Sequence, residues 1–193
     1  MDDIESEADV DLAKRLSLGE ERALGVLIRR YQEPLARYVR RRCYTCRSEI
    51  EDILQDVFLR VFSHIREFDP GMSFSAWIYR IAHNQMVSRI RKTTVRAGLE
   101  PFDDNLIPSS LFRTDGPTEM AELTRHLHAI QERMPAKLRD VFVLRFLEEK
   151  DYGEIGDILK ENGNTVATRI RRAREFVADE AQKLGLNLIL EDS

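Results

Sequence analysis

The chain has 193 residues, of which 42% are hydrophobic and 33% charged, so it can build a core in one large domain or two small ones. No apolar run approaches the length of a membrane span, and the N-terminus is acidic, so we expect no transmembrane helix, no signal peptide and a cytoplasmic location. The formal net charge of −4 gives no indication of nucleic-acid binding. Glycine and proline are sparse and apolar residues recur at helical spacing, which predicts an all-α protein of two small helical domains joined by a flexible linker.

The charges are segregated along the chain. Residues 1–11 hold six acids and no base, which predicts an acidic N-terminal tail. Residues 70–99 and 162–174 contain no acid. Both segments are rich in bases, at Arg80, Arg89, Arg91, Lys92 and Arg96 and at Arg169, Arg171, Arg172 and Arg174. Such patches concentrate positive potential where a phosphate backbone can lie, and the alternative is two solvated helix faces.

The first domain is predicted over residues 12–93. Its opening helix has one apolar stripe, and Pro34 should kink or break that helix. The stripe consists of Leu24, Leu27, Ile28, Tyr31, Leu35 and Tyr38. The next helix has the most regular period, with apolar residues at Ile50, Ile53, Leu54, Val57, Phe58, Val61, Phe62 and Ile65. A turn at residues 68–71 ends it, and Ser73 can cap a third helix over residues 74–92.

Cys43 and Cys46 are the only cysteines, and their C-x-x-C spacing can hold zinc or form a redox disulfide. A closed zinc site needs four ligands. The histidines offer no matching pair on a nearby element, at His64, His83, His126 and His128. We therefore expect two thiols near a helix end, with no metal and no cofactor.

The third helix carries a row of polar side chains that includes one aromatic ring. The row is Trp77, Arg80, Asn84, Ser88 and Arg91. Aromatic rings stack on bases and polar groups read base edges, so this row suits a nucleic-acid strand, and the loop at residues 68–73 could hold an unstacked base. Trp77 also falls on the apolar stripe of Phe74, Ile78 and Ile81, so its ring has two interpretations, core packing or strand contact.

Residues 94–118 predict a linker, which is unusually long for a connection within one compact domain. Turn-forming residues interrupt any period there, and acids return at Glu100, Asp103, Asp104 and Asp115. The second domain is predicted over residues 119–185, with a helix to Met134 and a break at Pro135. The helix after this break bears Leu138, Val141, Phe142, Leu144 and Leu147. Residues 186–193 are expected to form a C-terminal tail.

The end of the second domain has the pattern of a helix-turn-helix. A short helix over residues 152–160 packs through Tyr152, Ile155 and Leu159, a turn contains Asn162 and Gly163, and a longer helix begins near Asn164. The longer helix packs through Val166, Ile170, Ala173 and Val177 and directs Thr165, Thr168, Arg171 and Arg172 outward. Small polar residues let a helix enter the major groove closely, where arginine reads guanine edges and holds phosphate. The alternative is a basic amphipathic hairpin that only packs.

Four motifs resemble those of extracytoplasmic-function (ECF) sigma factors of bacterial RNA polymerase, in the order found in that family. Residues 51–62 (EDILQDVFLRVF) look like the region-two helix that grips a coiled coil of the β′ subunit. Residues 74–84 (FSAWIYRIAHN) are similar to the segment that melts and reads the minus-ten element. Residues 134–146 resemble the start of region four, which binds the flap of the β subunit. Residues 152–155 and 165–175 match the motif that reads the minus-thirty-five element.

The resemblance implies roles for individual residues. Core polymerase would bind Asp52, Gln55, Asp56 and Arg60. The minus-ten element and strand opening would involve Phe68, Asp69, Met72, Ser73, Trp77, Arg80, Asn84, Ser88, Arg91 and Lys92. The minus-thirty-five element would be bound by Thr165, Ala167, Thr168, Arg169, Arg171, Arg172 and Arg174. This sequence departs from the family where Lys160 and Glu161 replace a small and an apolar turn residue, and where Ala167 cannot donate a hydrogen bond at a commonly polar position.

These features predict a sigma factor that binds core RNA polymerase and promoter DNA, assists DNA melting, and has no catalytic residues. An anti-sigma protein is a further expected partner. The first alternative is a stand-alone helix-turn-helix regulator of duplex DNA, which would need neither the polar face at Asp52, Gln55 and Asp56 nor the row for a melted strand. The second is a thiol-based redox enzyme, which would need the C-x-x-C beside a βαβ pattern, and the sequence has no strand pattern.

Overall fold

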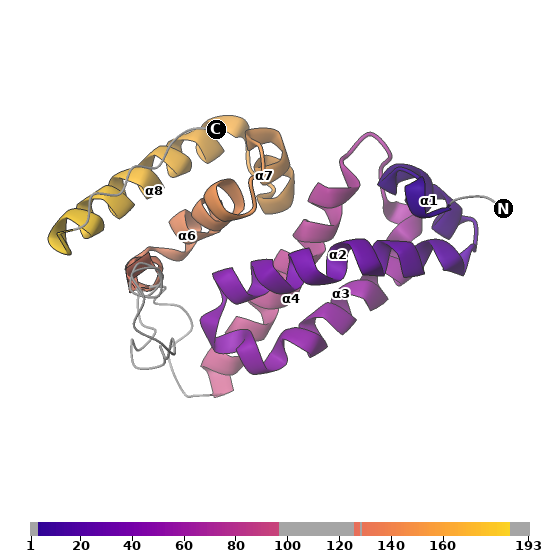
Figure 1. Ribbon diagram of the computed structural model, residues 1–193, viewed down its shortest axis with the longest axis horizontal. Helices are drawn as coiled ribbons and strands as arrows, with labels where there is room; N and C mark the ends of the chain where they lie inside the picture. Colours follow the sequence, from indigo (N-terminus) through magenta and orange to yellow (C-terminus); the bar gives the residue numbers. More distant parts are fainter. Residues whose placement is uncertain (1–3, 97–125, 128, 186–193) are drawn as a thin grey trace. The chain divides into compact units, whose positions relative to one another are not determined.

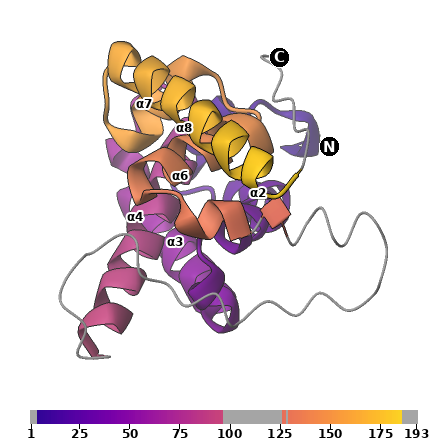
Figure 2. The same ribbon diagram turned by 90° about the vertical axis from the view of Figure 1, so that its left-hand side faces the viewer.

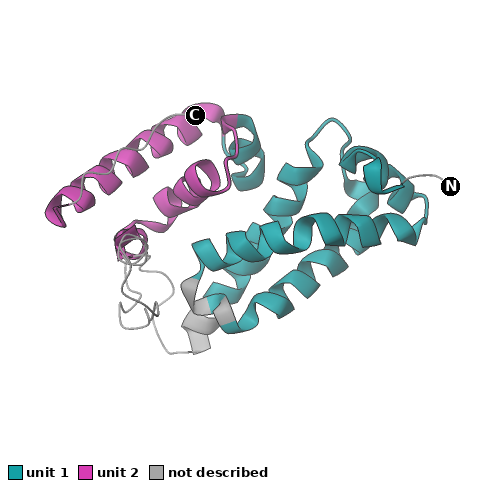
Figure 3. Cartoon of the chain, viewed as in Figure 1, with its two compact units in different colours: residues 1–101, 153–161 teal, residues 102–152, 162–193 magenta. Residues whose placement is uncertain are grey.

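The computed structural model describes residues 4–96, 126–127 and 129–185, and the regular elements in these residues are all helical (Figure 1). The all-α prediction is therefore confirmed. The chain divides into two compact units, residues 1–101 with 153–161 and residues 102–152 with 162–193 (Figure 3). The linker beyond residue 96 and the C-terminal tail lie outside the described residues, as do the linker acids.

The first unit is built on three long helices that pack against one another, α2 (Glu21–Arg42), α3 (Ile50–His64) and α4 (Phe74–Arg96) (Figures 1 and 2). A shorter helix, α1 (Asp9–Ser17), packs on α2 and contacts α4. Short 3₁₀ turns complete the unit, η1 (Ile4–Ser6), η2 (Tyr44–Glu49) and η3 (Ile65–Glu67). The largest fully buried side chains of this core include Leu27, Leu35, Tyr38, Ile53, Phe74, Ile78 and Met86.

Pro34 lies inside α2 and does not end it, so of the two predicted outcomes, a kink or a break, the break is wrong. Proline removes one backbone hydrogen bond and crowds the preceding turn, which weakens a helix in isolation. Here the turns on both sides are fixed by tertiary packing, because Tyr31, Leu35 and Val39 are buried at 8%, 0% and 0% exposure. Burial of this face is therefore strong enough to carry the helix through the proline.

The acids near the N-terminus form ion pairs with α1 and α2, and α1 begins at Asp9, within the predicted acidic tail. Arg15 donates to Glu20 at 2.7 and 2.6 Å and also pairs with Glu7. The Tyr31 hydroxyl donates to Asp9. Burial, and then this hydrogen bond, raise the pKa of Tyr31 well above its ordinary value, so the phenol stays a donor. Further pairs join Arg29 to Glu5 and Arg30 to Asp9.

The second unit has α6 (Ala136–Phe142) alongside α8 (Gly163–Lys183), as both ribbon views show (Figures 1 and 2). Helical residues 126–127 and 129–133 precede Pro135, where the predicted break is found. The guanidinium of Arg139, only 5% exposed, donates to the carbonyls of Glu132 and Met134 at 2.8 Å each and so secures this corner. A π-helical turn, η5 (Val143–Leu147), continues α6 and buries Val143 and Leu144.

α7 (Tyr152–Leu159) ends in a turn whose backbone conformation disfavours the residue that occupies it. Lys160 has φ of 56°, in the left-handed region where a Cβ atom is crowded. The Glu161 amide donates to the Gly156 carbonyl at 2.9 Å, the long-range bond of a Schellman cap, which usually has glycine in the place of Lys160. Gly156 is needed in this turn for lack of space, because a Cβ there would lie 2.8 Å from the Glu161 carbonyl oxygen.

Replacing Lys160 with glycine should raise the free energy of unfolding by about 0.5–1 kcal/mol, because relief of the left-handed strain exceeds the extra entropy of an unfolded glycine. Gly156→Ala should lower it by more than about 1 kcal/mol, since the new Cβ meets a backbone carbonyl. Urea unfolding of the full chain, followed by circular dichroism, measures both changes. Lys160→Ala keeps the Cβ and serves as the matched control with little expected change. A Lys160→Gly variant no more stable than Lys160→Ala would contradict this account of the turn.

Candidate nucleic-acid and protein interfaces

One face of α3 presents the polar residues predicted to bind a protein partner. Asp52, Gln55, Asp56 and Arg60 are all exposed, whereas Ile53, Leu54, Val57 and Val61 are buried on the other side of the helix. The side chains of Asp52 and Asp56 keep 68% and 54% of their surface exposed. We call these four exposed residues the polar face of α3.

Arg89 of α4 reaches the polar face of α3 and partly balances its charge. Its guanidinium lies 3.1 Å from Glu49, 3.8 Å from Asp56 and 4.0 Å from Asp52. The sequence places Arg89 in a basic segment of 70–99, but in the fold this arginine contacts carboxylates contributed by η2 and α3. The basic surface of α4 is correspondingly smaller than the sequence alone indicates.

An apolar groove lies between α2 and α3, next to the polar face. It has a volume of about 540 Å³ and is lined by Glu21, Leu24, Gly25, Ile28, Gln55, Phe58, Leu59 and Phe62. Leu59 and Phe62 are 57% and 47% exposed, so Phe62 is not the core residue that its period predicts. Gln55 belongs both to this groove and to the polar face of α3. Sequence periodicity missed the groove because it cannot tell a buried stripe from one that two helices leave open.

The loop between η3 and α4 is fixed by its own backbone and side-chain bonds. Asp69 Oδ1 accepts from the Gly71 amide at 2.9 Å, and the Asp69 carbonyl accepts from the Met72 amide at 2.9 Å. Ser73 Oγ accepts from the Ala76 amide at 3.4 Å, which is the predicted capping position for α4. Asp69 and Ser73 are exposed and Met72 is half-buried, so their side chains stay accessible in a defined turn.

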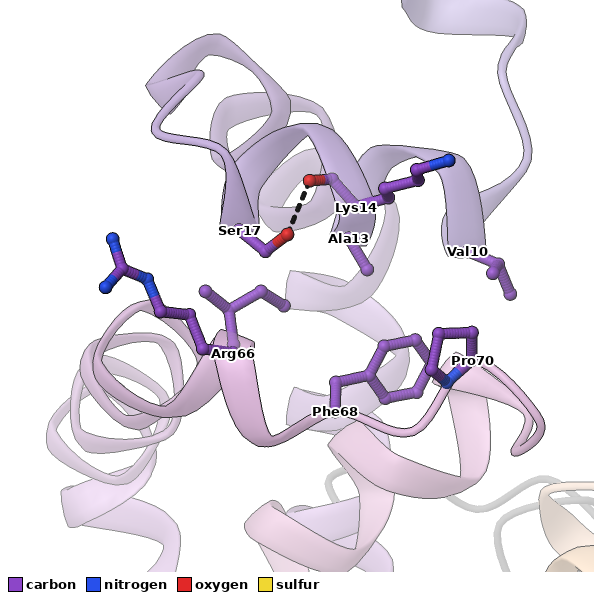
Figure 4. Close-up of a pocket in the computed structure, with 8 residues that line it drawn as sticks. Val10, Ala13, Lys14, Ser17, Arg66, Phe68 and Pro70 are labelled. Carbon is purple, nitrogen blue, oxygen red and sulfur yellow. Dashed lines mark hydrogen bonds between the residues drawn. The ribbon is translucent and has the colours of Figure 1, made fainter.

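Between this loop and α1 there is a hollow of about 210 Å³, which Figure 4 shows in close-up. Its walls come from α1, η3 and the loop, namely Val10, Ala13, Lys14, Ser17, Ile65, Arg66, Phe68 and Pro70. Ser17 lines the hollow, and its hydroxyl donates to the Lys14 carbonyl of the same helix at 2.7 Å. Lys14 and Arg66 contribute to the lining of this mostly apolar hollow, with their charged ends directed outward from Phe68 and Pro70 (Figure 4). Sequence reasoning missed both, because it did not anticipate that α1 packs beside this loop.

The aromatic residues of the loop and of α4 lie in the core of the first unit. Trp77 is 5% exposed and Phe68 is 9% exposed. Their ring centroids are 5.3 Å apart, and Phe74 lies 5.4 Å from Phe68 and 5.7 Å from Trp77. Of the two interpretations of Trp77, the structure favours core packing. Of the remaining residues of the row, Asn84, Ser88, Arg91 and Lys92 are exposed and Arg80 is half-buried.

α8 has the two faces that the sequence predicts. Val166, Ile170, Ala173 and Val177 are at most 1% exposed, which confirms the packed stripe. Ala167, Thr168, Arg171 and Arg172 are exposed, and Thr165, Arg169 and Arg174 are half-buried. The helix begins at Gly163, so the turn before it is one residue shorter than expected. In α7, Ile155 and Ile158 are buried, whereas Tyr152 is 37% exposed and is not the core residue that the sequence predicts.

Internal contacts reduce what several α8 side chains can offer to DNA. Asn162 caps the helix by accepting from the Thr165 amide at 2.9 Å and from the Thr165 hydroxyl at 3.0 Å. The Thr168 hydroxyl donates to the Asn164 carbonyl at 2.8 Å. Arg171 pairs with Glu175 at 2.8 Å, and the guanidinium of Arg174 lies 5.4 Å from the Phe146 ring centroid. Arg172 is therefore the outward arginine best placed to contact a phosphate or a base edge.

Cys43 and Cys46 form a disulfide, so the expectation of two thiols gives way to the bonded alternative. No group of three or more histidine, cysteine or acidic side chains in the described residues is placed to hold a metal ion. None of the described helices has both the length and the apolar character that crossing a membrane requires.

Comparison with known families finds two matches, one in each half of the chain. The family described as Sigma-70 region 2 matches residues 27–96, and the family described as Sigma-70, region 4 matches residues 125–177. The chain is 31% identical to the ECF RNA polymerase sigma factor SigW of Bacillus subtilis over 182 residues, which cover 89% of this chain and 95% of SigW. It is 29% identical to the ECF RNA polymerase sigma-E factor of Escherichia coli strain K12 over 188 residues, or 91% and 95% of the two chains.

Solved structures with the same arrangement of helices include CnrH in complex with the cytosolic domain of CnrY. CnrH superimposes with a TM-score of 0.68 at 25% identity, over 92% of this chain and 99% of CnrH. The sigma factor RpoE of Bartonella quintana, in complex with the anti-sigma factor NepR, has a TM-score of 0.56 at 16% identity over 90% and 93% of the chains. At that identity the second likeness supports the fold alone.

Proposed function

The chain belongs to the ECF sigma factors of bacterial RNA polymerase, and from this premise we propose how its surfaces divide the work of starting transcription. As a sigma factor, it binds core RNA polymerase and directs it to promoters. The observation that carries our assignment of surfaces is the polar face of α3, with the apolar groove beside it. A regulator that binds duplex DNA alone has no use for either feature, so this observation also separates the two leading hypotheses.

We assign core-polymerase binding to the polar face of α3 together with the groove between α2 and α3. Protein interfaces combine a desolvated apolar centre with a polar rim. Leu59 and Phe62 supply exposed apolar surface, and Asp52, Gln55 and Asp56 supply the rim. The carboxylates also steer a basic partner surface into register. Arg89 limits repulsion between them while the protein is free, and its side chain is within reach of the same interface.

We assign the melted minus-ten strand to the exposed row on α4 and to the hollow beside the loop. Asn84, Ser88, Arg91 and Lys92 offer amide, hydroxyl and cationic groups along one helix. The hollow combines apolar walls with Lys14 and Arg66, which suits a base and the phosphate next to it. Phe68 and Trp77 then act mainly by fixing the loop from within the core, and not by stacking on the strand.

We assign the minus-thirty-five element to the exposed face of α8. Arg172 and Arg171 are the cationic contacts, and Ala167 and Thr168 let the helix approach the groove closely. Sequence-specific reading is then concentrated in few side chains, since Thr165 and Thr168 already donate within their own helix.

The proposal extends to partners, chemistry and location. RpoE was solved with an anti-sigma factor and CnrH with the cytosolic domain of CnrY, so an anti-sigma protein is a proposed partner of this chain as well. The chemistry of RNA synthesis belongs to the polymerase, and we assign no catalytic residue to this chain. Because it acts on the polymerase and the chromosome, we place it in the cytoplasm.

The double substitution Asp52→Arg with Asp56→Arg should weaken binding to core polymerase by about a hundredfold or more, because like charges brought together across an interface cost several kcal/mol. Fluorescence anisotropy with purified core enzyme measures the affinity, and circular dichroism checks the fold. Glu33→Arg, a charge reversal at an exposed position of α2, is the control and should bind normally. Unchanged affinity of the double variant would refute this assignment of the polymerase surface.

Alanine at Arg171 and Arg172 should weaken upstream promoter contacts, at about 1–3 kcal/mol for a lost base contact. A lost phosphate contact should instead weaken all promoters alike and flatten the salt dependence. Glu175→Gln is the opposite control, because it releases Arg171 from its ion pair and removes a negative charge from the same face. Footprinting of the holoenzyme at the upstream element reads out both variants, and an unaltered footprint for the double alanine variant counts against this assignment of α8.

Two variants test the hollow by different means. Lys14→Ala with Arg66→Ala removes both cations, and Ser17→Leu fills the cavity while keeping them. Each should lower open-complex formation by about tenfold, the worth of one or two charged contacts, with little effect on initial promoter binding. Permanganate footprinting reports strand opening, and gel-shift titration reports initial binding. Arg22→Ala, at an exposed site on α2, is the matched control. Normal opening by Ser17→Leu would show that the hollow stays empty.

A further inference from the structure

Cys43 and Cys46 are the chain's only cysteines, and none of the surfaces assigned above includes them. They are bonded to each other across a Cα–Cα distance of 5.4 Å, within the ordinary range for a disulfide. Each is 3% exposed. Cys43 follows the last residue of α2, and Cys46 lies in the middle of η2, so the bond ties the end of one long helix to the turn that starts the next.

η2 is the point where the polar face of α3 is joined to the rest of the first unit. The turn packs against α2, α3 and α4. Its last residue, Glu49, lies three positions after Cys46 and is 3.1 Å from Arg89. Arg89 in turn lies within 4.0 Å of Asp52 and Asp56. A short chain of contacts therefore leads from the cysteine pair to the carboxylates assigned to polymerase binding.

The start of η2 is closed by a long backbone hydrogen bond. The Cys46 amide reaches the Cys43 carbonyl at 3.4 Å, near the limit for a hydrogen bond. Turns of the 3₁₀ type have poorer hydrogen-bond geometry and open more readily than α-helices. Without a covalent bond between the cysteines, the turn and Glu49 would sample more conformations, and the disulfide removes that freedom.

We propose that Cys43 and Cys46 are a reversible oxidation site that tunes binding of core polymerase, the disulfide form being the tighter binder. Reducing compartments keep such pairs as thiols until an oxidant arrives. A low-molecular-weight disulfide is the oxidant class that fits. One cysteine thiolate attacks it and expels one small thiol, and the second cysteine then displaces the other small thiol from the mixed disulfide. The protein loses two electrons, the oxidant gains two, and both cysteine protons end on the two released thiols.

The effect on affinity follows from order in the free protein. Binding to polymerase must fix Arg89 and the carboxylates around it, and a partner that is ordered in advance loses less entropy on binding. The cost of ordering one or two side chains corresponds to about a three- to tenfold change in the dissociation constant. This part of the inference rests on the proposed role of the polar face of α3.

The test uses the full chain treated with oxidised glutathione or with dithiothreitol and then desalted, so that neither reagent reaches the polymerase. Alkylation followed by mass spectrometry should show both thiols lost after oxidation and regained after reduction. Oxidised protein should bind core polymerase about three- to tenfold more tightly and melt at a higher temperature. Cys43→Ser with Cys46→Ser should give one affinity after both treatments, close to that of reduced wild type.

Each outcome decides a different point. Thiols that remain free after oxidised glutathione, or equal affinity and melting temperature in the two states, would overturn the switch even if Asp52→Arg with Asp56→Arg abolishes binding. Normal binding by that charge-reversal variant would overturn the polymerase surface instead. The wild-type affinities in the two states would then still establish whether the cysteine pair controls binding by another route.

Discussion

The fold of the first unit depends on how α4 is buried. Its first turns contribute Phe74, Trp77 and Ile78 to the core, at 1%, 5% and 0% exposure. With those rings fixed inside, the polar residues further along the helix can only face outward, where a row of them remains accessible. The Tyr38 hydroxyl lies 2.9 Å from His83 Nδ1, so the middle of α4 is also joined to α2 by a polar contact inside the unit. The position of the loop before α4, the hollow beside it and the reach of Arg89 all follow from this packing.

Many charged side chains form ion pairs within the fold, so the charge of a surface cannot be read from the sequence alone. Arg29 and Arg30 are adjacent in α2 and suggest a basic patch in the sequence, but in the fold they pair with Glu5 and Asp9. In the second unit, Glu180 is 7% exposed and lies beside Lys183 and Arg133, whose hydrogen bonds lower its pKa. That carboxylate stabilises the fold at neutral pH and loses its contribution as the pH falls through its lowered pKa. Exposed cations such as Arg91 on α4 and Arg172 on α8 lie on the two surfaces proposed to bind DNA, so a net charge of −4 does not oppose that proposal.

Sequence periodicity correctly predicted which face of α8 is buried. It failed where the exposure of a residue depends on how two helices pack against each other. Val166, Ile170 and Val177 are buried as their spacing requires. Pro34 was expected to kink or break α2, and the helix continues through it because packing on both sides outweighs a local propensity to stop. Phe62 has the right period for a core residue but lies at the open groove between the start of α2 and α3. The sequence pattern also did not predict that Arg89 lies close to Asp52 and Asp56, because this contact depends on the packing of α3 against α4.

The proposed polymerase contact at the apolar groove fits a subunit that exchanges between bound and free forms. A buried stripe would stabilise the free chain, whereas Leu59 and Phe62 gain burial only when a partner covers them. In the proposed interface, the exposed carboxylates next to them contribute orientation and rate of association more than affinity. Exposed apolar surface of moderate extent beside a charged rim gives binding that is specific and still reversible.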